Sequence, residues 1–213
     1  MRRVPFALLL ALFASCAETD DAPNNAPASA ALAEAGRTNT GGNPGTAAIR
    51  RFQSPEEALA AFRAGLNAPD SLRGGAPTRD ALIARFMQAV EGADTTAIRA
   101  MVLDRAEFAY LYYPTSPYTK SPTVQEAPLA WFLLVQNSQI GITRVFNRMA
   151  GSPEQYAGHR CDPEPSMEGA NRFWRECVVD LRTDRGELET RRLFGSIIER
   201  EGRFKFFSYA NDF

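Results

Sequence analysis

Residues 177–209 read CVVDLRTDRGELETRRLFGSIIEREGRFKFFSY, and this stretch decides the fold because strand patterns in it are separated by two turn sequences. At its start, Cys177, Val179 and Leu181 alternate with Val178, Asp180 and Arg182, which is the period of a strand with two different faces. The turn sequences are Asp184-Arg185-Gly186-Glu187 and Glu201-Gly202. We therefore predict antiparallel strands over 171–183, 188–200 and 203–209, preceded by a short strand over 155–161.

The chain before these strands carries helix signals. Ser54-Pro55, Thr78, and Asp94 or Thr95 are helix starts that precede apolar residues at helical spacing. They predict helices over 54–67, 79–91 and 95–102, and a longer pattern predicts a helix over 127–149, in which Gly141 marks either a kink or a close contact. Residues 107–113 are aromatic and apolar, which predicts a strand. This order indicates an α+β fold with N-terminal helices packed on a curved antiparallel sheet of about five strands.

The order of elements resembles the NTF2-like (SnoaL, cystatin-like α+β) superfamily. The resemblance is carried by the amphipathic helix 82–90, the short helix 94–102 and the final Phe204-Lys205-Phe206-Phe207-Ser208-Tyr209, and it covers roughly residues 75–213. It implies a strongly curved sheet that wraps a long helix and leaves a cone-shaped cavity. The helix over 54–67 would then be an N-terminal addition. The resemblance includes no catalytic motif.

The first sixteen residues resemble a bacterial lipoprotein signal. Arg2 and Arg3 precede an apolar run that is too short to span a bilayer, and small residues stand just before Cys16, with Phe13 in place of the usual leucine. The resemblance implies that residues 1–15 are a signal peptide and that Cys16 carries fatty acyl chains, including palmitate, which anchor the chain in a membrane. The alternative is an ordinary secretory signal cut near Ala17.

The residue after Cys16 indicates the membrane to which the chain would be anchored. Residue 17 is alanine and not aspartate, which by analogy with a known sorting rule favours the outer membrane, facing the periplasm or the cell surface. Residues 16–51 contain few large apolar side chains, so we expect a disordered tether there and a folded domain over 52–213. The expected location is therefore the bacterial cell envelope.

The charge and the cysteine content limit the kinds of partner and cofactor that this chain is expected to bind. The full chain has 24 basic and 25 acidic residues, and removal of Arg2 and Arg3 with the leader leaves 22 against 25, a balance that argues against nucleic acid as a partner. Cys161 and Cys177 lie sixteen residues apart, and in an exported protein they are expected to form a disulfide; the alternative is two free buried thiols. Together with His159 they provide too few ligands for a metal site, and we expect no metal and no cofactor.

Ligand-pocket candidates are the polar and aromatic residues expected near the cone, namely Tyr110, Tyr112, Trp131, Asp180 and Phe206. We assign no catalytic residue, because no set of acids, bases and nucleophiles copies a known catalytic group. His159, the only histidine, is expected to have a structural or solvent-facing role. The sequence thus favours a binding protein for a small apolar ligand or a protein partner. The alternatives are a small isomerase, dehydratase or hydrolase that uses the cone, and a structural module that forms a homodimer.

Overall fold

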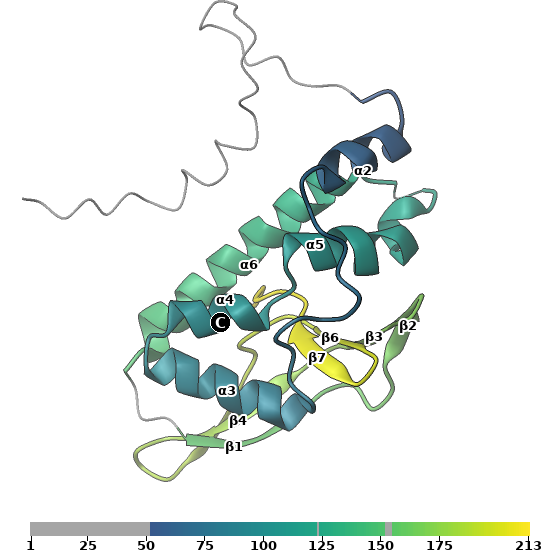
Figure 1. Ribbon diagram of the computed structural model, residues 1–213. Coiled ribbons are helices and arrows are strands. Elements are labelled where there is room, and N and C mark those ends of the chain that lie inside the picture. The colour runs from purple at the N-terminus through teal and green to yellow at the C-terminus, as the bar shows by residue number, and fades with distance from the viewer. Residues whose placement is uncertain (1–51, 123, 152–154) are drawn as a thin grey trace, which may run out of the picture. The chain divides into compact units, whose positions relative to one another are not determined.

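The computed structural model describes residues 52–122, 124–151 and 155–213, and over these ranges it is an α+β fold (Figure 1). The described residues form five α-helices and seven strands. The helices are α2 (Pro55–Arg63), α3 (Arg79–Glu91), α4 (Thr95–Met101), α5 (Arg105–Glu107) and α6 (Ala127–Met149). Figure 1 shows α2 beside the N-terminal part of α6, the longest helix, and α3 and α4 nearer its C-terminal end. No helix within these ranges is long and apolar enough to cross a membrane.

Three predicted helix starts are confirmed by side-chain caps. The hydroxyl of Ser54 accepts a hydrogen bond from a first-turn amide of α2 at 3.2 Å, and that of Thr78 does the same for α3 at 3.1 Å. The Asp94 carboxylate accepts two amide hydrogens of α4 at 3.0 and 2.9 Å. Each cap satisfies a backbone donor that has no partner within its helix. Helix α2 ends at Arg63, earlier than predicted, and Gly65 just beyond it has a positive φ of 76°.

The strand predicted over 107–113 is wrong, because this segment is helical. Helix α5 continues into the π-helical turn η2 (Phe108–Tyr112) and then into the 3₁₀ turns η3 (Tyr113–Thr115) and η4 (Pro117–Thr119). Asp104 and Glu107 form a capping box in which each side chain accepts a hydrogen bond of 2.8 Å from the other residue's amide. The box starts a helical turn immediately before the aromatic run, and this local interaction overrides the β propensity of the aromatic residues.

The antiparallel pairing is confirmed, but the described strands number seven instead of about five, and they pair in two sheets. One has the order β1-β4-β5 and the other β2-β3-β6-β7. Their bounds are β1 Gln155–Arg160, β2 Ser166–Glu168, β3 Asn171–Trp174, β4 Val178–Arg182, β5 Leu188–Arg191, β6 Ile197–Arg200 and β7 Arg203–Phe206. The two long predicted strands are each interrupted, the first at Glu176, whose φ of 46° breaks the extended conformation.

Both predicted hairpin turns are confirmed. Strands β4 and β5 pair so that Asp180 faces Thr190, and β6 and β7 pair across the Glu201-Gly202 turn, where both residues have positive φ. The predicted disulfide between Cys161 and Cys177 is also present, and it links the residue after β1 to the residue before β4. The bond therefore reinforces a strand pair that already exists.

The apolar interior consists of two clusters. The first joins α3, α4 and the C-terminal half of α6 to β4 and β7, and Phe86, Val145, Val179 and Phe206 are among its residues. The second joins α2, η2 and the N-terminal part of α6 to β3 and β6, with Phe108 and Phe173 in it. Helix α6 thus contributes to both clusters, and its packing decides how they are joined.

Gly141 lies where α6 meets the C-terminal segment of the chain. A Cβ atom on it would overlap the carbonyl oxygen of Tyr209, so the prediction of a close contact is confirmed. Around this contact Ser138 accepts a hydrogen bond from the Tyr209 amide at 2.9 Å, and the Asn211 side chain donates to the Gly141 carbonyl at 3.1 Å. Glycine is required here because the two backbones approach without a side chain between them.

Replacement of Gly141 by alanine is expected to destabilise the domain, although alanine favours a helix by about 1 kcal/mol over glycine. The new methyl group displaces the Tyr209 backbone, which we expect to lower the free energy of unfolding by about 2 kcal/mol or more, as overpacking does. Urea unfolding followed by circular dichroism measures this change. Gly158→Ala is the matched control, because no atom lies within 4 Å of its added Cβ. Equal effects of the two substitutions would contradict the role of the contact.

Candidate functional site

The five predicted pocket residues do not surround one cavity. Phe206 is fully buried in the first cluster, between Phe86 and Phe194, whereas Tyr112 is buried in the second. Trp131 packs at the edge of the second cluster, and Tyr110 lies beneath the guanidinium of Arg63, 4.4 Å from its ring centroid. The aromatic candidates therefore fill space inside the domain or on its edge.

Asp180 is buried on β4 with both carboxylate oxygens bonded. One oxygen accepts a hydrogen bond from Arg160 of β1, and the other accepts one of 2.6 Å from the hydroxyl of Thr190 on β5. The carboxylate thereby links all three strands of its sheet. A carboxylate whose oxygens are already bonded to the protein in this way is suited to holding strands together.

A pocket of about 440 Å³ lies beside the C-terminal segment, away from the predicted candidates. Its lining includes Arg175, Glu176, Arg192, Ser196, Ser208 and Asn211. Arg192 donates two hydrogen bonds to Glu176, at 3.0 and 3.2 Å, and Arg175 donates to Glu168 at 2.8 Å. Both arginines of the pocket are therefore already paired with carboxylates of the protein.

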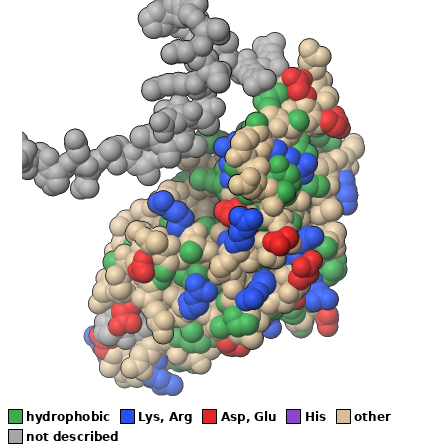
Figure 2. Space-filling model, in the orientation of Figure 1, with side chains coloured by type: hydrophobic (Ala, Val, Ile, Leu, Met, Phe, Trp, Pro, Cys, Tyr) green, Lys and Arg blue, Asp and Glu red, His purple; other side chains and the backbone are tan. Residues whose placement is uncertain are grey.

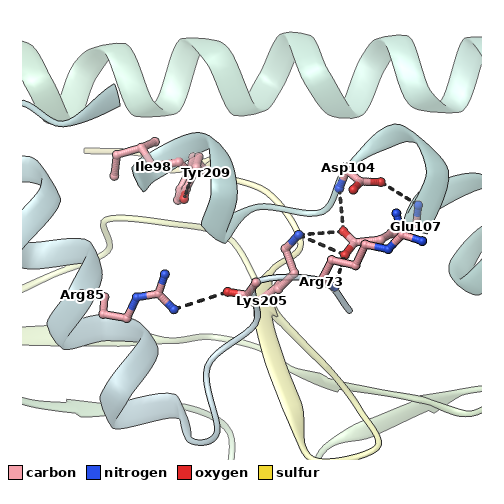
Figure 3. Close-up of polar contacts among 8 residues, drawn as sticks. Arg73, Arg85, Ile98, Asp104, Glu107, Lys205 and Tyr209 are labelled. Atoms are coloured by element: carbon pink, nitrogen blue, oxygen red, sulfur yellow. Dashed lines mark hydrogen bonds and ion pairs between the residues drawn. The ribbon is translucent and has the colours of Figure 1, made fainter. Parts of the chain in front are cut away.

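The most deeply buried charges are those of Glu107 and Lys205, which Figure 3 shows meeting between α5 and β7. The Lys205 ammonium donates to both carboxylate oxygens of Glu107, at 2.8 and 3.1 Å. The same carboxylate accepts the amide hydrogens of Arg73 at 2.6 Å and Asp104 at 2.8 Å. Three donor groups thus make four hydrogen bonds to the two oxygens, and the anion is satisfied without water, as a buried charge requires.

Sequence reasoning did not single out this ion pair, although two signals for it were present. One is the Asp-x-x-Glu spacing of Asp104 and Glu107, which is typical of a capping box. The other is Lys205, one of only two lysines in the chain, which stands between apolar residues of a predicted strand. A lysine in such a position is seldom fully buried unless it is paired.

Removal of one partner of this pair is expected to cost about 3–5 kcal/mol of the free energy of unfolding, because an uncompensated charge remains buried. Glu107→Gln and Lys205→Met each test this in urea unfolding. The double variant Glu107→Gln, Lys205→Met should lose less than the sum of the two single variants, since it leaves neither charge behind. Additive losses would show that the two charges do not interact.

His159, a half-buried residue of β1, is the next titratable group of note. Its Nδ1 atom lies 2.8 Å from the Tyr156 hydroxyl and 3.3 Å from an oxygen of Asp80, which connects β1 to the first turn of α3. Burial lowers the pKa of His159, an effect that Asp80 opposes and Arg79 supports. Burial, together with Asp80, raises the pKa of Tyr156 to about 12. Both rings are therefore neutral near pH 7, and the contacts of His159 with Tyr156 and Asp80 agree with the structural alternative of the role expected for it.

The pKa of His159 predicts a dependence of stability on pH. The pKa of His159 in the folded state lies below its value of about 6.5 in the unfolded state. Between these two pKa values the unfolded chain binds more protons than the folded chain, so the free energy of unfolding rises with pH in that range. The contribution is complete above about pH 6.5 and is lost as the pH falls through the folded-state pKa. Urea unfolding between pH 7 and 5 should show this loss for the parent chain and a smaller loss for His159→Gln. Since the chain has one histidine, parallel curves would contradict the assignment.

The largest exposed apolar side chains of α6 lie on one face of the helix. Leu129, Phe132, Leu133 and Ile140 are 50, 47, 42 and 49% exposed. They lie opposite Ala130, Ile142 and Val145, which are buried in the two clusters. The exposed side was not predicted, because a helix with apolar residues on both faces is usually taken to be buried.

This exposed face of α6 carries no charge over most of its length. Residues 127–143 contain no Asp, Glu, Lys or Arg. Elsewhere acidic and basic side chains are interspersed, as the view in Figure 2 shows for one side of the domain. An apolar, uncharged face on the surface of a domain marks a site of interaction.

Comparison of the chain with models of protein families, with curated proteins and with solved structures finds no match. The function is therefore inferred from the residues themselves. The exposed face of α6 has the largest group of exposed apolar side chains on one element among the described residues.

Proposed function

We propose that this chain is a lipid-anchored protein of the bacterial cell envelope whose folded part docks another protein on the exposed face of α6. The anchor rests on the lipoprotein-like signal that ends at Cys16, which lies outside the described residues, as do the signal peptide and the tether. The disulfide between Cys161 and Cys177 supports an oxidising compartment such as the periplasm or the cell surface. The outer membrane remains the proposed site of attachment.

The observation that carries the docking function is the exposure of Leu129, Phe132, Leu133 and Ile140 on one face of α6. Four large side chains half in contact with water are unfavourable, at about 25 cal/mol for each Å² of apolar surface. Their spacing along a helix fits the groove of another helix, so the proposed partner presents a helix to α6.

We also propose that the two sheets are parts of one sharply bent sheet, in the manner of the NTF2-like superfamily. Only Arg175, Glu176 and Cys177 separate β3 from β4, and residues 192–196 alone separate β5 from β6. Chain continuity therefore joins the sheets at two neighbouring places. The long helix α6 and the terminal β6–β7 pair are further elements that such a domain contains.

The docking proposal predicts that position 140 is covered in the envelope. In the full chain, Ile140→Cys in isolated envelopes should react with a water-soluble maleimide roughly tenfold more slowly than Leu188→Cys, a matched control that is 59% exposed on β5. The two cysteines should react at similar rates after denaturation. Equal rates in the envelope would contradict docking at α6.

Two further measurements complete this experiment. Cys16→Ala should move the chain to the soluble fraction and abolish the incorporation of labelled fatty acid, whereas continued partition into detergent would refute the lipid anchor. A fluorophore attached at position 140 should not be quenched by lipids with brominated acyl chains. Quenching would place the face in the bilayer and would contradict a protein partner.

A further inference from the structure

We propose that the protein docked on α6 is a second copy of this chain, with the two α6 helices antiparallel and crossing near Gln136. This inference rests on the docking function proposed above and names its partner. The resulting dimer is isologous, since the same face of each copy contacts the other about a two-fold axis. Three properties of α6 support it: the spacing of the exposed residues, the position of the charges, and the chemistry at the centre.

The exposed residues of α6 follow the spacing of a helix–helix seam. Leu129, Leu133, Gln136, Ile140, Thr143 and Asn147 succeed one another at alternating intervals of four and three residues. This 3.5-residue repeat keeps a seam turned toward a second helix, and about 1.5 Å of rise per residue makes the seam roughly 27 Å long. Each of these side chains is exposed or half-buried, so the seam is open in the single chain. A partner helix of the same length covers it.

The charges at the two ends of α6 favour an antiparallel second copy. Glu126 precedes the helix, Arg144 and Arg148 are exposed near its end, and no charge lies between positions 126 and 144. Glu126 and Arg144 are eighteen residues apart, which is about five turns, so they share one edge of the seam. In an antiparallel pair this edge of one copy faces the same edge of the other copy, so each Glu126 approaches the partner copy's Arg144. A parallel pair would instead leave both Glu126 side chains at one end and the arginines at the other, with no ion pair between them.

Both arginines are already held in position. The Arg144 guanidinium donates a hydrogen bond to the Asn211 carbonyl at 2.9 Å, and the Arg148 guanidinium lies 4.9 Å from the ring centroid of Phe213. The C-terminal residues thus fix the basic end of the seam, which lowers the entropy cost of forming ion pairs. An anionic bilayer is a poorer fit to this face, because Glu126 and the exposed Glu56 and Glu57 of α2 stand near its other end.

At the centre, the pairing brings Leu133 of each copy against Ile140 of the other, and Gln136 beside its own counterpart. Two amide side chains at a two-fold axis both donate and accept hydrogen bonds, so Gln136 is self-complementary. Polar residues in an otherwise apolar seam fix register and partner at some cost in stability. Thr143 and Asn147 extend this polar character toward the ends.

Cysteine cross-linking of the full chain in its envelope tests the geometry. Gln136→Cys should form a disulfide-linked dimer on mild oxidation, because the two copies of this position lie within about 2 Å of each other along the axis at 1.5 Å per residue. Leu129→Cys should not, since its two copies are roughly 22 Å apart along the same axis. A mixture of Leu133→Cys and Ile140→Cys chains should cross-link with each other. Self-linking at both 129 and 136 would indicate a parallel pair and overturn the antiparallel model.

Sedimentation of the purified full chain in detergent tests the partner. The parent chain should be a dimer, and Ile140→Glu should raise the dissociation constant roughly hundredfold without changing the circular dichroism spectrum, as a charge in an apolar seam does. Glu126→Arg and Arg144→Glu should each weaken the dimer, and the double variant should restore it.

The outcomes separate this inference from the docking function on which it rests. A parent chain that is monomeric, with no cross-link at 136, overturns the second copy as partner. If position 140 is nevertheless protected in the envelope, the docking function stands with a different protein. If position 140 is also freely labelled there, both fail.

Discussion

The buried ion pair between Glu107 and Lys205 is the interaction on which the arrangement of the domain depends. Neither side chain reaches water, so the carboxylate must obtain all of its hydrogen bonds from the protein. It does so from the ammonium of β7 and from the amides of Arg73 and Asp104, which lie on two other segments. Three segments that are far apart in sequence are thereby held at one point. Strand β7, the capping box and the loop before α3 cannot move independently.

The position of Glu107 in this ion pair also determines the conformation of the aromatic residues that follow it. Once Glu107 occupies the third position of a capped turn, the chain leaves it as a helix, and Phe108 and Tyr112 enter the interior on the same side. Tyr112 then contacts Phe173 of β3 and Phe207 after β7, with ring centroids 5.5 and 4.7 Å apart. Tyr112, one of the predicted pocket residues, is therefore packed among these rings. Their burial raises the pKa of Tyr112, so this phenol is unsuited to proton transfer near neutral pH.

Local signals predicted those parts of the fold that local interactions determine. Ser54, Thr78 and Asp94 cap helices, Gly186 and Gly202 lie in hairpin turns, and α6 has its predicted bounds. The parts of the fold that were not predicted depend on contacts between residues that are distant in the chain. The break at Glu176 places a non-glycine residue at positive φ, and the helical run after Asp104 was hidden by its aromatic composition. The same holds for the site, since the apolar residues of α6 were evident but the face they occupy was set by tertiary packing.

Close packing on one side of α6 determines what the other side can do. Gly141 admits the backbone of Tyr209, and the chain then runs along the helix to Asn211 and Phe213, which hold Arg144 and Arg148. The same contact buries Ile142 and Val145, so the neighbouring turn must present Ile140 outward. The buried contact at Gly141 and the exposed seam therefore both follow from the way α6 packs on the domain. With the lipid anchor proposed above, a weak seam would be enough to pair two copies, because confinement to a surface raises their effective concentration.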